Sequence, residues 1–200
     1  TRAEVLTQLP ERTDSTIFVE LSSAQKTPYD DQVIMLARLL QKGLLTDVDR
    51  KRILACLSNL RLICDSTFLF DKETHVSPKL VEFRDVIEDL MSSGEHKTVI
   101  FSQWETMLME AAHVLDELNV GYALLTGNMN GKERRNVMAQ FAEPACRMFL
   151  STDAGGVGLN LQLADTVINL ELPWNPAVLE QRIARVHRMG QTRPVRVINF

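Results

Sequence analysis

Short apolar runs alternate with amphipathic stretches over residues 78–200, and this alternation limits the possible folds more than any other feature of the chain. Five runs have the length and composition of buried strands. They are Thr98–Ser102, Tyr122–Thr126, Arg147–Ser151, Thr166–Leu170 and Val195–Asn199. Ser77 as an N-cap, followed by Pro78 in the first turn, predicts that the first helix of this region begins there. The pattern predicts an α/β domain with a doubly wound parallel sheet.

Residues 1–77 have a different character. Apolar residues recur at helical spacing between Asp31 and Cys64, and one alternating stretch, Thr16–Leu21, has the pattern of a strand. We therefore expect a mostly helical segment over residues 1–77 that leads into a lobe over residues 78–200. Phe200 falls at the end of the last predicted strand, so we expect the lobe to be incomplete at its C-terminus.

The composition, with 45% hydrophobic and 24% charged residues, is that of a soluble globular chain. No apolar run approaches the roughly 20 residues that a membrane span needs, and no secretion signal begins the chain. These features predict a protein of the bacterial cytoplasm (nucleoid) or of the nucleus, without membrane contact. Cys56, Cys64 and Cys146 lie far apart in apolar stretches, so we expect reduced core residues.

Positive charge is concentrated near the C-terminal end, although the formal net charge is −4. Five arginines and one histidine occur between Arg182 and Arg196 without a carboxylate. Such a run is either a solvated face or a surface that meets an anion.

The segment Ser151–Asn160 follows a predicted strand and contains three glycines within four residues. Glycines let main-chain amides approach a phosphate closely, although the segment could also be a structural turn. A dinucleotide-binding fingerprint is a second alternative. It fits poorly because Leu161 occupies the third glycine position and about eight residues are too few for a crossover helix.

Residues 176–189 form the second chemistry-bearing segment, which we expect to be one helix that begins at Asn175 and Pro176 and ends at Gly190. At about 100° per residue, Gln181, Arg185 and Arg188 lie on the side opposite the apolar stripe. The two guanidinium groups could neutralise a phosphoryl group in transfer, or they could form surface ion pairs. We expect His187 to be structural.

A phosphate-gripping loop is absent from the sequence, which contains no G-x-x-x-x-G-K-[ST] and no acidic pair placed to hold Mg²⁺. The nearest approach, Gly127–Lys132, is one residue too short. We therefore predict no metal site in this chain and expect the phosphate cradle on another domain.

The chain resembles the C-terminal RecA-like lobe of Swi/Snf-type ATPases of helicase superfamily two. The resemblance is carried by segments that occur in the family's order: Val99–Trp104, Leu125–Gly127 with Arg134, Ser151–Asn160, Ala164–Ile168, Pro173–Pro176 and Gln181–Gln191. The first part of the chain, with Glu4–Leu6, Leu9–Pro10 and Leu60–Cys64, resembles the segment that joins the two lobes. The chain departs from the common family pattern at Asp153, where a basic residue is usual, and at Ala184, where Asp is usual.

The resemblance implies a role for each matched position. Arg185 and Arg188 would be catalytic arginine fingers that complete an ATP site on the partner lobe, and Gln181, Gly158 and Asn160 would couple that site to DNA. The positions implied to lie along the DNA backbone are Ser102, Gln103, Thr126, Gly127, Thr152, Gly155, Gly156, Trp174 and Asn175. A carboxylate at Asp153 in the DNA-facing loop would oppose contact with phosphates.

The function that follows is the C-terminal motor lobe of an ATP-dependent double-stranded DNA translocase or remodeller, a DNA-dependent ATPase. ATP with Mg²⁺ would be held mainly by an N-terminal RecA-like lobe of the same protein, so the fragment alone is expected to be inactive. The track would be duplex DNA, and a DNA-bound protein could be the substrate. Three alternatives remain open, namely an RNA-directed helicase lobe, a dinucleotide-binding enzyme domain and a non-catalytic module that binds acidic partners.

Overall fold

The computed structural model describes residues 9–127, 129–153 and 159–200, which form two compact units. One unit is the helical region Val19–Glu82, and the other combines the residues up to Phe18 with Phe83–Phe200. The helical region is thus inserted into the second unit. Sequence analysis placed the helical segment at residues 1–77 instead, with no part of it in the lobe.

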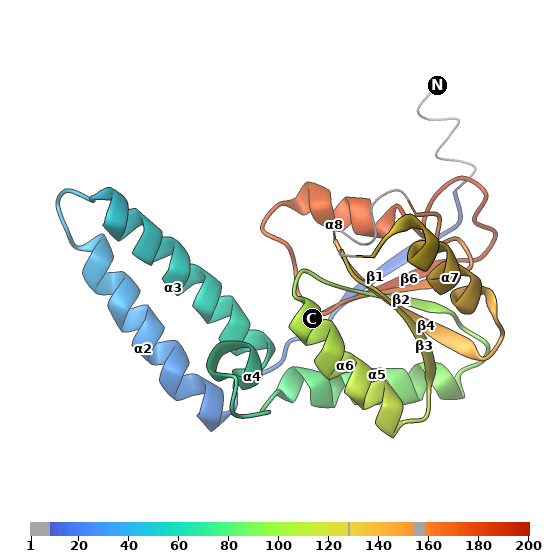
Figure 1. Cartoon of the computed structure of the whole chain (residues 1–200), viewed down its shortest axis with the longest axis horizontal. Coiled ribbons are helices and arrows are strands. Elements are labelled where there is room, and N and C mark those ends of the chain that lie inside the picture. The colour runs from blue at the N-terminus through green and yellow to red at the C-terminus, as the bar shows by residue number, and fades with distance from the viewer. Residues whose placement is uncertain (1–8, 128, 154–158) are drawn as a thin grey trace. The chain divides into compact units, whose positions relative to one another are not determined.

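The lobe is built on a six-stranded parallel sheet with the strand order β1-β6-β5-β2-β4-β3 (Figure 1). The strands are β1 (Arg12–Thr16), β2 (Thr98–Ser102), β3 (Gly121–Leu125), β4 (Cys146–Thr152), β5 (Thr166–Asn169) and β6 (Val195–Asn199). All five strands predicted for residues 78–200 are present, and each predicted end agrees with the structure to within one residue. The predicted α/β class with a doubly wound parallel sheet is confirmed.

Strand β1 was not predicted, and the strand expected over 16–21 is wrong except at Thr16. β1 is an edge strand with mostly exposed side chains, and its sequence Arg-Thr-Asp-Ser-Thr contains no apolar residue. β1 therefore lacks the apolar pattern used to predict the other strands. Its position is set by backbone pairing with β6, in which Arg12 lies opposite Val195. The Arg12 guanidinium also bonds Glu180 at 2.9 Å and thereby lowers the pKa of that carboxyl group.

Helices cover both faces of the sheet (Figure 1). One face carries α5 (Pro78–Ser92) and α6 (Glu105–Glu117), and the other carries α7 (Gly131–Ala142) and α8 (Pro176–Ile183). Ser77 caps α5 as predicted, since its hydroxyl accepts from the Leu80 amide at 3.2 Å. The central strands β2 and β4 are buried almost throughout, which explains their continuous apolar sequences.

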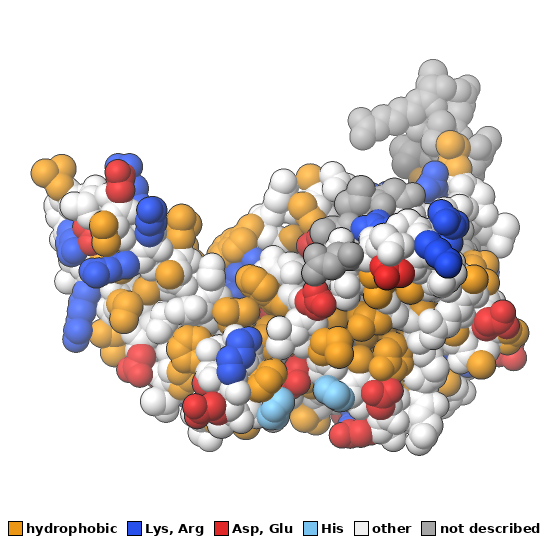
Figure 2. All heavy atoms as spheres, in the orientation of Figure 1, with side chains coloured by type: hydrophobic (Ala, Val, Ile, Leu, Met, Phe, Trp, Pro, Cys, Tyr) orange, Lys and Arg blue, Asp and Glu red, His pale blue; other side chains and the backbone are white. Residues whose placement is uncertain are grey.

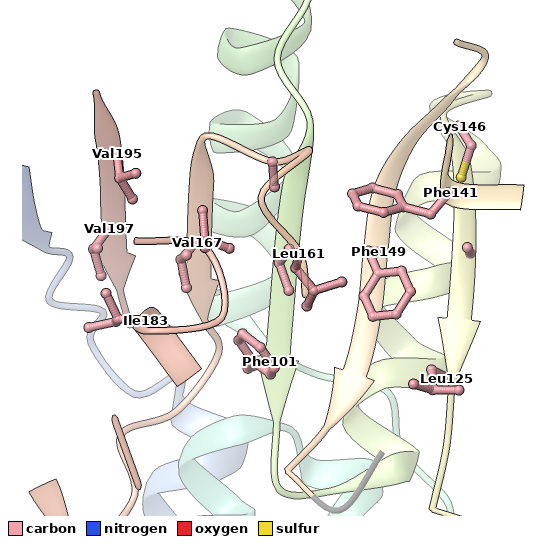
Figure 3. Packing of buried hydrophobic residues seen from close by; sticks show 14 residues of the cluster. Phe101, Leu125, Phe141, Cys146, Phe149, Leu161, Val167, Ile183, Val195 and Val197 are labelled. Carbon is pink, nitrogen blue, oxygen red and sulfur yellow. The ribbon is translucent and has the colours of Figure 1, made fainter. Parts of the chain in front are cut away.

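The core on the α7 and α8 face is assembled from alternate residues of the strands (Figure 3). Phe101 and Phe149 point to this face from β2 and β4. Phe141 of α7 lies beside Phe149, and Ile183 of α8 lies beside Val197 of β6 in the same cluster. The rings of Phe141 and Phe149 have centroids 5.0 Å apart. Because Ile183 belongs to this core, the last turn of α8 is attached firmly to the sheet.

The helical unit contains α2 (Ser23–Leu40), α3 (Asp47–Asp65) and the short α4 (Thr67–Asp71). Capping boxes begin both long helices, with Ser22 and Gln25 at α2 and Thr46 and Asp49 at α3. Lysine and arginine side chains gather over this hairpin (Figure 2).

The three cysteines are free thiols, as predicted. Cys56 and Cys146 are buried, whereas Cys64 is half-buried, so the expectation of a core position holds for the first two. Burial raises the pKa of the Cys146 thiol. Among the described residues, none of the helices has the length and hydropathy of a membrane span.

We predict that Gly121→Ala destabilises the lobe by about 1–3 kcal/mol, because overpacking forces backbone shifts of that cost. A Cβ atom at Gly121 would lie 2.3 Å from the backbone oxygen of Ala145, next to the irregular register of β3 and β4. Urea unfolding followed by circular dichroism measures the change.

Gly131→Ala is the matched control, since the nearest atom to its Cβ would be the end of the Arg135 side chain at 3.8 Å. At this helical position the substitution should be neutral or stabilising by up to about 1 kcal/mol. Equal unfolding midpoints for the two variants would contradict the steric explanation.

Candidate functional site

The ends of four parallel strands meet at one edge of the sheet, where sequence analysis placed the candidate residues. Ser102 lies opposite Thr152, and Leu125 lies opposite Ser151, so the loops after β2, β3 and β4 are neighbours. Asn169 ends β5 beside Phe101 of β2. This edge is where ligands of open parallel sheets usually bind.

The predicted DNA-facing residues differ in exposure. Ser102, Thr126 and Thr152 are buried, and the Ser102 hydroxyl accepts from the Trp104 amide at 3.0 Å, which shapes the turn after β2. The accessible members of the set are Gln103, Gly127, Trp174 and Asn175, and Trp174 is 73% exposed. Gly155, Gly156 and Gly158 lie outside the described residues.

A buried arginine that sequence analysis did not single out lies at the centre of this edge. Arg182 of α8 is 3% exposed and forms a two-point ion pair with Asp153, with nitrogen–oxygen distances of 2.5 and 2.9 Å. It also donates to the Asn169 side chain at 3.3 Å and to the Glu171 carbonyl at 3.0 Å. Its guanidinium carbon lies 5.8 Å from the centre of the Phe101 ring.

The same contacts join the ends of four strands. The Glu171 carboxylate, 3.5 Å from Arg182, accepts from the amide of Gln103 after β2. Asn169 of β5 donates to Asn199 of β6 at 2.9 Å, and Asp153 follows β4. Arg182 therefore ties α8 to the edge that carries the candidate site.

Asp153 acquires a structural explanation from this network. The sequence raised the objection that a carboxylate here would repel phosphates. In the structure the carboxylate is committed to Arg182, which supplies a matching guanidinium fork. Arg182 and Asp153 are 29 positions apart in the sequence. The helical pattern compares only residues a few positions apart, so it could not predict this ion pair.

The helix expected over residues 176–189 is shorter than predicted. It begins as expected, with Asn175 capping the Ala177 amide at 3.0 Å and Pro176 in the first turn, but it ends at Ile183. Residues 184–190 form successive turns instead. The Leu161 amide donates to the Arg185 carbonyl at 3.0 Å, so an interaction with a distant segment replaces a helical bond there.

The angular argument that placed Gln181, Arg185 and Arg188 on one helical face is therefore wrong, because only Gln181 is helical. Gln181 and Arg188 are exposed, and Arg185 is half-buried. Within the part of the chain that the structure describes, neither arginine forms an ion pair or a side-chain hydrogen bond. The alternative that local carboxylates neutralise them finds no support among those residues.

Two other positions considered in the sequence analysis lie within or in contact with the arginine segment. His187 is structural as expected, since its Nε2 lies 2.9 Å from the Pro10 carbonyl oxygen. Asn160 is exposed, and its side chain donates to the Gln162 side chain at 3.0 Å. Asn160 directly precedes Leu161, whose amide bonds the arginine segment.

The dinucleotide alternative requires a helix between the glycine loop and the next strand. Residues 159–165, the described part of that connection, contain no helix before β5 begins at Thr166. The glycine loop also follows β4, the fourth strand along the chain, instead of the first. Neither feature fits the fingerprint, in which a strand, the loop and a crossover helix follow in order.

Comparison with known proteins gives consistent matches. Residues 79–190 match the family described as "Helicase conserved C-terminal domain". The whole chain aligns with "Chromodomain-helicase-DNA-binding protein 1-like" of Danio rerio at 36% identity, and the aligned region is 20% of that protein's length. The whole chain also aligns with "SWI/SNF chromatin-remodeling complex subunit snf22" of Schizosaccharomyces pombe at 31% identity, and the aligned region is 13% of that protein's length. The chain thus spans about a fifth or less of these relatives.

A solved structure, "Sulfolobus solfataricus SWI2/SNF2 ATPase core in complex with dsDNA", has the same fold. It superposes with a TM-score of 0.82 at 28% identity, over 98% of this chain and 42% of that one. A second solved structure, "Sulfolobus solfataricus SWI2/SNF2 ATPase core domain", superposes with a TM-score of 0.79 at 29% identity, over 98% of this chain and 41% of that one.

We predict that Arg182→Met lowers the free energy of unfolding by up to about 3–5 kcal/mol, because it leaves the buried Glu171 carboxylate and the half-buried Asp153 carboxylate without their cation. Arg182→Lys should recover little of the loss, since one ammonium group cannot reproduce the planar fork. Chemical unfolding of the two variants at neutral pH measures both effects.

Arg188→Met provides the control, because this exposed side chain makes none of these contacts and its loss should stay within about 0.5 kcal/mol. If Arg182→Met proves as stable as Arg188→Met, the buried network does not hold the edge together.

Proposed function

Since the chain belongs to the helicase conserved C-terminal domain family and is the second RecA-like lobe of a Swi/Snf-type ATPase, we propose that it drives an ATP-dependent double-stranded DNA translocase. The observation that carries the proposal is the contrast between three arginines of one segment. Arg182 is buried and paired, whereas Arg185 and Arg188 remain accessible without carboxylate partners among the described residues.

Arg185 and Arg188 would act on a nucleotide held by another lobe. ATP with Mg²⁺, which the family uses generally, supplies the phosphoryl group that is transferred to water. The two guanidinium groups fit such a ligand because their donors match phosphate oxygens and are not consumed by ion pairs within the described chain. Their role would be to offset the negative charge that spreads over the γ-phosphoryl group.

The partner lobe would supply the phosphate-gripping loop and the acidic Mg²⁺ site, which this sequence does not contain. The curated relatives are several times longer than the chain, which leaves room for such a lobe in the whole protein. Gln181, exposed on α8, would report the state of the nucleotide between the lobes.

Duplex DNA would run along the carboxyl edge of the sheet. Gln103, Gly127, Trp174 and Asn175 are the accessible groups there, and we propose that they meet the DNA backbone together with the glycine loop at 155 and 156. Ser102, Thr126 and Thr152 would hold the loops in place beneath them. Contacts of this kind carry no base information and weaken with salt.

Asn160 and Gly158 would couple the two activities. Asn160 adjoins Leu161, whose amide bonds the Arg185 carbonyl, so a displacement of the glycine loop would reach the arginine segment through the main chain. The description of the archaeal neighbour as a complex with double-stranded DNA supports duplex DNA over RNA as the track. The DNA-bound protein that is moved, and the nucleus or bacterial cytoplasm as location, stay predictions.

In a polypeptide that carries both lobes, Arg185→Ala or Arg188→Ala should each reduce DNA-stimulated ATP turnover by about 10³-fold or more, a loss typical of arginine fingers. Affinity for duplex DNA should change little, because these side chains face the nucleotide. Steady-state phosphate release and DNA binding by fluorescence anisotropy measure the two quantities. Turnover close to the unmodified level in both variants would refute the finger assignment.

The isolated 200-residue chain should show no ATP turnover above background, with or without duplex DNA, since nothing in its sequence grips the β- and γ-phosphates. Adding equal lengths of duplex DNA and duplex RNA to the two-lobed protein tests the track. DNA-stimulated turnover by the isolated chain would overturn the division of labour between lobes, and stronger stimulation by RNA would favour the RNA-directed alternative.

A further inference from the structure

The early end of α8 raises the question of what positions Arg185 and Arg188. Short-range main-chain bonds help to place Arg185, whose amide donates to the Arg182 carbonyl at 3.1 Å, but the helix itself stops at Ile183. A segment that carries charge-neutralising groups must nevertheless hold them to within a fraction of an ångström, since small misplacements cost large factors in rate. Beyond these short-range bonds, the constraint on the segment comes from tertiary contacts of residues 184–191.

Gln191 makes more of these contacts than its neighbours in the segment. Its side chain is 6% exposed, and its amide nitrogen donates to the carbonyl oxygens of Ala164 at 2.8 Å and of Val186 and Gln162 at 3.3 Å. Its Oε1 accepts from the amides of the next two residues at 3.0 and 3.1 Å. One side chain therefore satisfies five main-chain groups.

Two bonds of Gln191 reach the part of the chain that carries the arginines. Val186 lies between them, and the main-chain amide of Gln191 donates to the carbonyl of Arg188 at 3.0 Å. Gly190, with φ of +94°, turns the chain so that both bonds can form. The Gln162 side chain, which donates to the Met189 carbonyl, packs 3.2 Å from where a Cβ of Gly190 would lie.

We infer that Gln191 is a positioning residue for the arginine segment, and that it holds Arg188 at the orientation required to reach a phosphoryl group on the partner lobe. The inference rests on the proposed function of Arg188. Gln191 touches no nucleotide in this scheme. It acts by anchoring the 185–190 turns to the 162–164 segment that precedes β5.

The competing explanation is that Gln191 only stabilises the fold. Its buried amide satisfies main-chain carbonyls, and loss of such bonds is costly in any protein. The two explanations differ in their effect on kinetics. A group that acts through an arginine finger changes kcat with little effect on KM, because the finger's interaction is made in the transition state. A fold-stabilising group changes neither constant once the protein is folded.

The test uses Gln191→Met, which keeps the length of the side chain and removes its hydrogen bonds, in the two-lobed polypeptide. We expect kcat for DNA-stimulated ATP hydrolysis to fall by about 10–100-fold, the loss that displacement by about 1 Å can cause. KM for ATP and affinity for duplex DNA should stay close to the unmodified values. Gln140→Met is the control, because Gln140 also donates to a carbonyl, that of Tyr122 at 2.9 Å, on the remote helix α7.

A double-mutant cycle with Arg188→Ala separates the outcomes. If Gln191 acts through Arg188, the double variant should be no slower than Arg188→Ala alone, and additive losses would overturn the inference. Unchanged kcat in a folded Gln191→Met protein would also overturn it, while a large loss in Arg188→Ala would leave the proposed function standing. Full activity of Arg188→Ala would contradict the proposed function of Arg188 itself. Circular dichroism melting confirms that each variant is folded under the assay conditions.

Discussion

The buried guanidinium of Arg182 is the interaction on which the arrangement of the candidate site depends. It connects α8 to Asp153 after β4 and to the Asn169 and Glu171 groups after β5, so three segments share one cation. An ion network of this kind is favourable only while every partner stays in place, because each buried charge carries a large desolvation cost. The edge of the sheet is consequently stiff beneath the loops that would meet DNA. The accessible arginines begin only three residues beyond this anchor, where the chain leaves the helix.

Much of the fold could be predicted because strands that are buried on both faces of a parallel sheet have continuous apolar sequences. β2 and β4 are covered on both faces, and their boundaries were found almost to the residue. β1 escaped because an edge strand with exposed side chains has no apolar signature, and its backbone pairs with β6 far along the chain. The insertion of the helical unit within the lobe escaped for the same reason. Without β1, nothing in the sequence attached residues before Val19 to the lobe.

The site was predicted unevenly. Convergence of the loops after β2, β3 and β4 followed from parallel topology alone, and the structure has it. The length of α8 did not follow, since apolar spacing as far as Val186 and a glycine at 190 favoured a helix to residue 189. Tertiary hydrogen bonds from Leu161 and Gln191 take the place of helical bonds there. Arg182 was overlooked because a helical wheel ranks positions by angle and contains no information about a carboxylate on another strand. The roles of Arg185, Arg188 and the DNA-facing residues came from family resemblance and remain proposals.

The pairing of β1 with β6 bears on how the lobe is made. Arg12 lies opposite Val195, so this edge closes only after all the residues between them, the helical unit among them, have been synthesised. Contacts between residues so distant in sequence carry a loop-closure entropy that local hairpins do not, and they generally form late. Until β1 pairs with it, β6 would be an open edge with unsatisfied amide and carbonyl groups, the feature that invites aggregation of partly folded chains. The polar strand β1 is therefore also a cover for the edge of β6, and its pairing belongs to the late steps of folding.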